Sequence, residues 1–181
     1  MPRCLAFLRA VNVGGRQVKM DALRNAFEEL GLADVSTFIA SGNVRFETKA
    51  RSLAALEGKI ESHLQSVFGF EIDTFIRTEA ELAAIATHEA FDAKLLAGAK
   101  THVVGFMRSP PDDSAQRALA AFEGDADRFV LHGRELHWAS GFKQSESTFS
   151  NASFERALKL RATFRSITTV RKLAAVGPAL D

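Results

Sequence analysis

The first 77 residues alternate between the apolar spacing of strands and the apolar spacing of helices. Apolar residues that recur at intervals of three and four predict two amphipathic helices, which end at Gly31 and Gly69. Short apolar runs predict four strands, Leu5–Leu8, Val35–Ile39, Val44–Glu47 and Ile72–Ile76. The resulting order, β-α-β-β-α-β, is that of the ferredoxin-like or split βαβ unit.

A new helix start follows this unit. Thr78 and Glu81 form a T-x-x-E capping box, in which each residue satisfies a backbone N–H of the other. We place the boundary between two halves of the chain here, so that the halves are residues 1–77 and 78–181.

The second half repeats the pattern of elements without repeating the residues. An apolar strand, His102–Met107, precedes a helix and then a hairpin that turns at His132-Gly133. After one more helix, a further helix at Thr169–Val176 stands where a fourth strand is expected. We therefore predict an α+β fold of two ferredoxin-like halves with antiparallel sheets, the second half incomplete and ending in an extra helix.

Composition limits the possible partners. The chain is 46% hydrophobic and 25% charged, and its net charge of +1 gives no global basic field for nucleic acid or anionic membrane. The single cysteine, Cys4, excludes an intramolecular disulfide. The apolar run Cys4–Leu8 is too short for a signal-peptide core or a membrane span, so we expect a cytoplasmic protein without a membrane partner.

Two loops rich in glycine and asparagine follow apolar strands near the start of the chain. They are RAVNVGG, Arg9–Gly15, and SGN, Ser41–Asn43. In the split βαβ unit the sheet order is 4-1-3-2, so strands one and three are neighbours and the two loops should lie side by side. The first helix begins at the same edge, where its unpaired amides carry partial positive charge.

These features predict a cradle for a small anionic ligand, such as a nucleotide or a phosphorylated metabolite. Arginine would neutralise the anion, asparagine and serine would orient it, and glycines would offer backbone amides. Arg165 would close the site from the C-terminal segment. The candidate ligand-binding residues are Arg9, Asn12, Gly14, Gly15, Ser41, Gly42, Asn43 and Arg165. The alternative is that both loops are ordinary structural turns.

At these loops the sequence resembles the bacterial family of unknown function DUF1697. That family typically shows R-G-I-N-V-G-G after its first strand and Q-S-G-N-V before its third, and this chain has RAVNVGG and ASGNV, the latter at Ala40–Val44. The helix DALRNAFEELG, Asp21–Gly31, and the strand GRELHW, Gly133–Trp138, extend the similarity over nearly the whole chain. The resemblance implies two ferredoxin-like halves and supplies no established activity.

The chain departs from the family pattern in three places. Ala10 stands where the family usually has glycine, and Glu146 stands where it usually has lysine. The C-terminal T-x-R-N-W-N-T-V of the family reads TFRSITTV here, Thr163–Val170, so that Ser166–Thr168 replace two amides and an aromatic ring. A site shared with the family would therefore be intact at its N-terminal part and altered at its C-terminal part.

We expect no metal site and no cofactor. The five histidines show no metal-ligand spacing on a helix face. His132 and His137 are an odd number of positions apart, and a regular strand would point them to opposite faces.

Three classes of function stay open: a binder of a small anion, a nucleic-acid-binding module, and a non-catalytic interaction scaffold. RNA-recognition domains stack bases on strand aromatics, and Phe7 and Phe46 occupy such strands. The first strand is apolar on both faces, however, which favours a core role for these rings. Whether the protein is an enzyme is undecided, because no general base is evident in the sequence.

Overall fold

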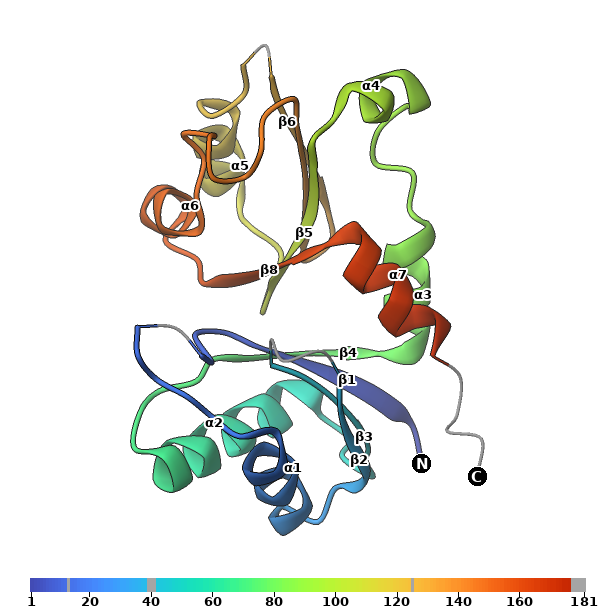
Figure 1. Cartoon of the computed structure of the whole chain (residues 1–181), viewed down its shortest axis with the longest axis vertical. Helices are drawn as coiled ribbons and strands as arrows, with labels where there is room; N and C mark the ends of the chain where they lie inside the picture. The colour runs from blue at the N-terminus through green and yellow to red at the C-terminus, as the bar shows by residue number, and fades with distance from the viewer. Residues whose placement is uncertain (13, 39–41, 125, 177–181) are drawn as a thin grey trace. The chain divides into compact units, whose positions relative to one another are not determined.

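The computed structural model describes residues 1–12, 14–38, 42–124 and 126–176, and they form a mixed α+β structure. The chain divides into two compact units, Met1–Leu82 and Ala83–Asp181. Each unit contains one four-stranded antiparallel sheet (Figure 1). The division falls inside helix α3, Glu79–Thr87.

The sheet of the first unit has the strand order β2-β3-β1-β4, which confirms the 4-1-3-2 order expected of a split βαβ unit. Helices α1 and α2 cover one face of this sheet (Figure 1). The expected second strand included Ile39, which lies outside the described residues. The elements are β1 (Arg3–Leu8), α1 (Met20–Glu29), β2 (Ala33–Phe38), β3 (Asn43–Glu47), α2 (Leu53–Phe68) and β4 (Thr74–Thr78).

The core of the first unit forms where the apolar stripes of α1 and α2 meet the sheet. Leu23 and Phe27 of α1 and Ile60 of α2 are fully buried, and Phe27 contacts Phe46 of β3 with ring centroids 5.7 Å apart. Burying such side chains stabilises a fold by about 1.5–3 kcal/mol each. The helical spacing of these residues therefore determines which face of each helix packs against the sheet.

Cys4 lies in β1 and is fully buried. Burial, with Glu81 and Glu79 adding like charge, raises the pKa of the Cys4 thiol to about 11. A thiol in this state behaves as a small core hydrophobe.

The capping box that begins α3 is confirmed: Glu81 N donates to Thr78 Oγ1 at 3.1 Å, and Thr78 N donates to Glu81 Oε2 at 2.8 Å.

The sheet of the second unit has the same topology, with strand order β6-β7-β5-β8. Helices α5 and α6 pack on one face of it, while α4 and α7 lie on the other side of the sheet in Figure 1. Trp138, Phe149 and Phe154 are central to the core under α5 and α6. The elements are α4 (Ala93–Gly98), β5 (Thr101–Met107), α5 (Asp113–Ala120), β6 (Asp127–His132), β7 (Glu135–Ser140), α6 (Asn151–Leu158), β8 (Ala162–Ser166) and α7 (Ile167–Ala175).

The expectation that the second half lacks its fourth strand is wrong. Strand β8 pairs with β5 over Val103–Met107 and completes the sheet before α7 begins. The strand escapes notice in the sequence because it is only five residues long and runs directly into a helix whose N-cap is Ser166. Gly105 shows how closely the strands fit: a Cβ there would lie 2.6 Å from the ring of Phe164 on β8.

Candidate functional site

The two glycine- and asparagine-containing loops lie side by side at one edge of the first sheet. Phe7 of β1 pairs with Asn43 of β3, and Leu8 N donates to Gly42 O at 2.8 Å just beyond that pair. Gly42 has φ +74°, and a Cβ added there would lie 3.1 Å from Leu8 Cβ and 3.4 Å from Val11 Cγ2. Only glycine combines this backbone conformation with such a close approach.

Both asparagines hold the loops in shape. Asn12 has φ +61°, and its Oδ1 accepts a hydrogen bond from Val18 N at 2.8 Å, which closes the loop onto the chain leading to α1. Asn43 is almost fully buried, and its Nδ2 donates to Phe38 O at 3.1 Å. Asparagine tolerates the left-handed region, which suits Asn12, and its side chain replaces backbone partners in turns, which suits both positions. A direct role for either side chain in orienting a ligand stays a prediction.

Arg9 is anchored at the end of β1. Its Nη1 lies 3.3 Å from Asp73 Oδ2, and its backbone N donates to Asp73 O at 2.9 Å. The arginine side chain keeps 27% of its exposed area and the aspartate side chain 15%. The guanidinium is therefore held at the edge of the sheet by a carboxylate that would compete with any bound anion.

An open hollow of about 420 Å³ lies where the first loop runs into α1. The described residues that form its walls include two cationic side chains and no carboxylate or imidazole. The guanidinium carbon of Arg16 lies 4.7 Å from the centre of the Phe70 ring, which holds that cation over an aromatic face. The residues that line the hollow are Asn12, Gly15, Arg16, Gln17, Val18, Lys19 and Met20.

Helix α1 begins at this hollow with Lys19 as its N-cap, and no side chain caps it. Every other helix in the described part of the chain has an oxygen-bearing side chain bonded to an amide of its first turn. Lysine is also the wrong charge for the positive end of a helix dipole. The capping residues of the other helices are Ser52, Thr78, Asp92, Asp112, Ser150 and Ser166.

The remaining candidate residues are distributed as follows. Gly14 and Gly15 adopt φ values of +62° and +80° with open space around them, so their amides lie in an accessible turn. Ser41 lies outside the described residues. Arg165 belongs to β8 of the second unit, where its Nη1 donates to Thr163 Oγ1 at 2.7 Å and to Phe164 O at 3.0 Å. Burial lowers the pKa of the Arg165 guanidinium to about 10. Its closing of the loop site stays a prediction.

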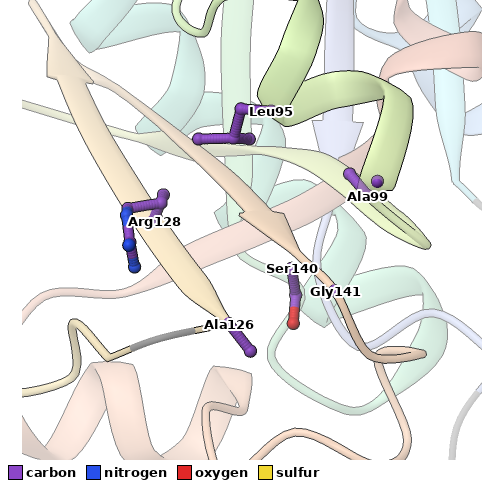
Figure 2. A pocket seen from close by; sticks show the side chains of 7 residues that line it. Leu95, Ala99, Ala126, Arg128, Ser140 and Gly141 are labelled. Carbon is purple, nitrogen blue, oxygen red and sulfur yellow. The ribbon is translucent and has the colours of Figure 1, made fainter.

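A second hollow, of about 190 Å³, lies in the second unit between α4 and the β6–β7 hairpin. Figure 2 shows Leu95 and Ala99 on the α4 side and Arg128, Ser140 and Gly141 on the strand side. The Arg128 guanidinium donates to the carbonyl oxygens of Gly124 and Asp127. This hollow is smaller than the usual ligand pocket of roughly 300–1,000 Å³.

Four of the five histidines gather in the second unit, which the sequence reasoning missed. The separation of His132 and His137 does not place them on opposite faces, because the β6–β7 turn lies between them and His132 pairs with Glu135. A strand-parity rule applies only within one strand. The predicted hairpin turn at His132-Gly133 was the signal that would have placed the two rings together. Among the described residues, no group of three or more side chains is arranged to hold a metal ion.

Of the two aromatic residues considered for base stacking, Phe46 is a core residue of the first unit. Phe7 and Phe46 are fully buried. Phe46 belongs to the cluster between the sheet and the helices of the first unit. The ring of Phe46 therefore offers no exposed stacking platform of the kind that RNA-recognition domains present.

No helix in the described ranges is long and apolar enough to cross a membrane. No curated protein matches the sequence. Among solved structures, the conserved bacterial protein SP0830 from Streptococcus pneumoniae is similar, with a TM-score of 0.73 and 22% identity over 96% of this chain and 97% of that one. That likeness concerns the fold.

The family described as protein of unknown function (DUF1697) matches residues 1–137. The match contains both N-terminal loops and ends one residue before Trp138, so the altered segment Thr163–Val170 lies beyond it. Since the matched part is well over half of the chain, the protein belongs to the DUF1697 family.

Proposed function

We propose that the protein binds a small anionic ligand, a nucleotide or a phosphorylated metabolite, at the hollow where the Arg9–Gly15 loop meets α1. The observation that carries the proposal is the start of α1. It lacks a side-chain cap, has Lys19 at the capping position, and opens onto a hollow of about 420 Å³. The first amides of a helix lack intrahelical partners, and a bound anion satisfies them and the dipole together.

The local charge supports the same conclusion. Arg16 and Lys19 both line the hollow at the positive end of the helix dipole. A cation at this end is unfavourable by about 0.3–1 kcal/mol, and an anion between the cations reverses the sign of that interaction. Asp21 in the first turn is engaged with Arg24 at 3.3 Å and is more than four-fifths exposed. The hollow therefore presents amides and cations to a ligand.

The roles of the loop residues follow from their positions. Gly14 and Gly15 supply amides in left-handed turns, a geometry that suits phosphate oxygens. Asn12 acts by fixing the loop through Val18 N, and Gly42 acts by holding the second loop against β1. Arg9 reaches the ligand when the ligand competes with Asp73 for its guanidinium. The proposal is limited to binding, because the described residues that line the hollow include no general base.

Thermal shift of the full chain with inorganic phosphate, pyrophosphate and nucleoside mono- and triphosphates tests the proposal, with sodium chloride at equal ionic strength as the salt control. A ligand at one hundred times its Kd stabilises the native state by about 2.7 kcal/mol. We expect Lys19→Gln to weaken the shift and Arg9→Ala to abolish it. Lys59→Gln, which removes an exposed lysine from α2, should leave the shift unchanged.

Asp73→Asn sharpens the role of Arg9. This change releases the guanidinium from its carboxylate partner without removing it. If Arg9 contacts the anion, the ligand-induced shift in melting temperature should grow in Asp73→Asn. An unchanged shift in both Asp73→Asn and Arg9→Ala would limit Arg9 to a structural role. Stabilisation by none of the phosphates, or stabilisation only by single-stranded RNA with steep salt dependence, would contradict the proposal.

A further inference from the structure

Three histidines share the face of the second sheet that is turned away from α5 and α6. His132 of β6 pairs with Glu135 of β7, and His137 lies two residues beyond Glu135 on the same strand. His102 of β5 pairs with Ala139, which lies two residues beyond His137. Paired residues of neighbouring strands share a face, as do residues two apart on one strand. We call this the histidine face.

The connection between α3 and α4 supplies a fourth imidazole and covers this face. The ring of His88 lies 4.1 Å from that of His132 and 5.1 Å from that of His137, measured between centroids. His102 lies 6.2 Å from His137 and meets the edge of Phe91 at 5.5 Å. Residues 88–92 thus contact the sheet through imidazole and phenyl rings.

The two most deeply placed imidazoles, His137 and His102, favour the neutral form. His137 is completely buried, and neither of its ring nitrogens has a hydrogen-bond partner among the described residues. The Nε2 atom of His102 is likewise buried and without such a partner. Burial, and after it the neighbouring His88, His102 and His132, lowers the pKa of His137 to about 4. Burial, and then Arg171, lowers the pKa of His102.

The surrounding charges give protonated rings little compensation. Glu135 is the one carboxylate that strand register places on this face within the described residues, and it is buried beside His132. Of the acids on the covering connection, Glu89 is exposed and Asp92 caps α4 through Leu95 N. Three arginines belong to elements around the face: Arg128 of β6, Arg165 of β8 and Arg171 of α7. Their positive charges oppose protonation of the imidazoles.

We propose that acidification detaches the 88–92 connection from the histidine face and so exposes that face to solvent. Imidazole is the side chain that gains charge between pH 8 and pH 5. The rings of His88 and His132 are tilted by 34° with centroids 4.1 Å apart, and they lie beside a fully buried His137 that has no hydrogen-bond partner among the described residues, so charge gained by this group of rings produces mutual repulsion. Separation of the connection from the sheet relieves that repulsion.

Two fixed ends define the moving part. Arg171 Nε of α7 donates to Ala86 O at 3.4 Å and holds the last turn of α3. At the other end, Asp92 caps α4 with an Oδ1 to Leu95 N distance of 2.7 Å. The connection between these two anchors is short, and His88 and Phe91 are its contacts with the histidine face. A local opening therefore does not require either helix to unfold.

Hydrogen–deuterium exchange of the full chain at pH 7.5 and pH 5.0, corrected for intrinsic rates and run with a chelator, tests this proposal. We expect protection of residues 88–92 to fall at least several-fold at pH 5.0, while that of α3 is kept. The same loss should appear in His63→Gln, which removes the fifth histidine, held by Glu29 in the first unit. In His88→Gln/His132→Gln the loss should disappear. His132→Gln alone, at an exposed position, should reduce it if the double variant does not fold.

The emission of Trp138 separates local opening from global unfolding. This only tryptophan lies on β7 beneath α5 and α6, on the opposite face from His137. We expect its emission to stay constant while the 88–92 connection opens. Equal protection at both pH values, equal loss in the histidine variants, or a shift of Trp138 emission together with the loss would each overturn the proposal.

Discussion

The two units share one strand order but differ at the connection that follows their first strand. In the first unit, β1 leads into α1 through a long glycine-rich loop, and the helix starts at Lys19 without a side-chain cap. In the second unit, β5 leads into α5 through a short segment with Pro110 and Pro111, and Asp112 caps the helix through Ala115 N at 2.8 Å. One topology thus supports an open helix start and a closed one.

This difference indicates where each unit has unsatisfied chemistry. The first unit leaves amides and cations at the edge of its sheet, at Arg16 and Lys19. The second unit caps its helix starts and instead buries imidazole nitrogens of His102 and His137 that have no hydrogen-bond partner within the described part of the chain. The first arrangement suits a ligand, and the second suits a response to protons.

Lowering the pH should give the largest difference in stability between the two units, because it destabilises the second unit. The folded-state pKa of His137 is about 4, below the ordinary 6.5, so the unfolded chain binds more protons in this window. The stabilisation is fully present above pH 6.5 and is lost as the pH falls toward 4. Each such proton changes the unfolding constant roughly tenfold per pH unit. Urea unfolding followed by Trp138 emission between pH 7 and 4.5 measures this, and His137→Phe should flatten the dependence while His63→Gln should not.

Gly42→Ala should damage the edge of the first sheet. The left-handed backbone and the 3.1 Å approach to Leu8 Cβ both oppose a side chain, so we expect a loss of about 1–3 kcal/mol in unfolding free energy. Gly31→Ala is the matched control, since it has φ +76° with open space around it and should cost about 1 kcal/mol. Equal losses in the two variants would show that the close approach contributes nothing.

Removing the N-cap of α5 and adding one to α1 should change the unfolding free energy in opposite directions. Asp112→Ala removes the cap of α5 and should cost about 1 kcal/mol. Lys19→Asp gives α1 the cap it lacks and should add about 0.5–1 kcal/mol, while it weakens stabilisation by inorganic phosphate. Chemical denaturation with and without phosphate measures both quantities. A Lys19→Asp variant that gains stability and keeps the full phosphate response would break the link between the open helix start and binding.

Ala10→Gly should have the smallest effect. Ala10 has φ +63°, a region that costs a residue with a Cβ about 1 kcal/mol, so glycine should raise the unfolding free energy by a few tenths to about 1 kcal/mol. The gain is limited because glycine also has more freedom in the unfolded chain. Denaturant midpoints at constant slope provide the measurement, and a lower midpoint would show that the loop tolerates alanine without strain.

The elements that sequence predicted well are those in which local and tertiary signals agree. Helix α2 ends at Gly69 as expected, because its apolar stripe and the left-handed Gly69 indicate the same end. The adjacency of the two loops also follows from strand order alone. Strand β8 was missed because pairing with β5 and the gap left by Gly105 hold it in place, and a five-residue window shows neither.

The candidate site was predictable in place and less so in detail. The sequence identified the loops and the α1 start, but the Arg9–Asp73 pair joins residues 64 positions apart. The Asn12 contact with Val18 N depends on a left-handed backbone that composition only suggests. The histidine face depends on pairing across three strands, so single-strand parity gave the wrong answer for His132 and His137.

The buried thiol of Cys4 is an intrinsic probe of the opening of the first sheet. It is the only cysteine in the sequence, and its pKa of about 11 together with full burial keeps it from reacting with an alkylating reagent while β1 is in place. Where alkylation is faster than reclosing, it proceeds at the rate at which the first sheet opens around Cys4, and where it is slower it reports the population of the open form. Trp138 has the matching place in the second sheet. Cys4 alkylation and Trp138 emission therefore follow the unfolding of the two units separately in one sample, with no label introduced.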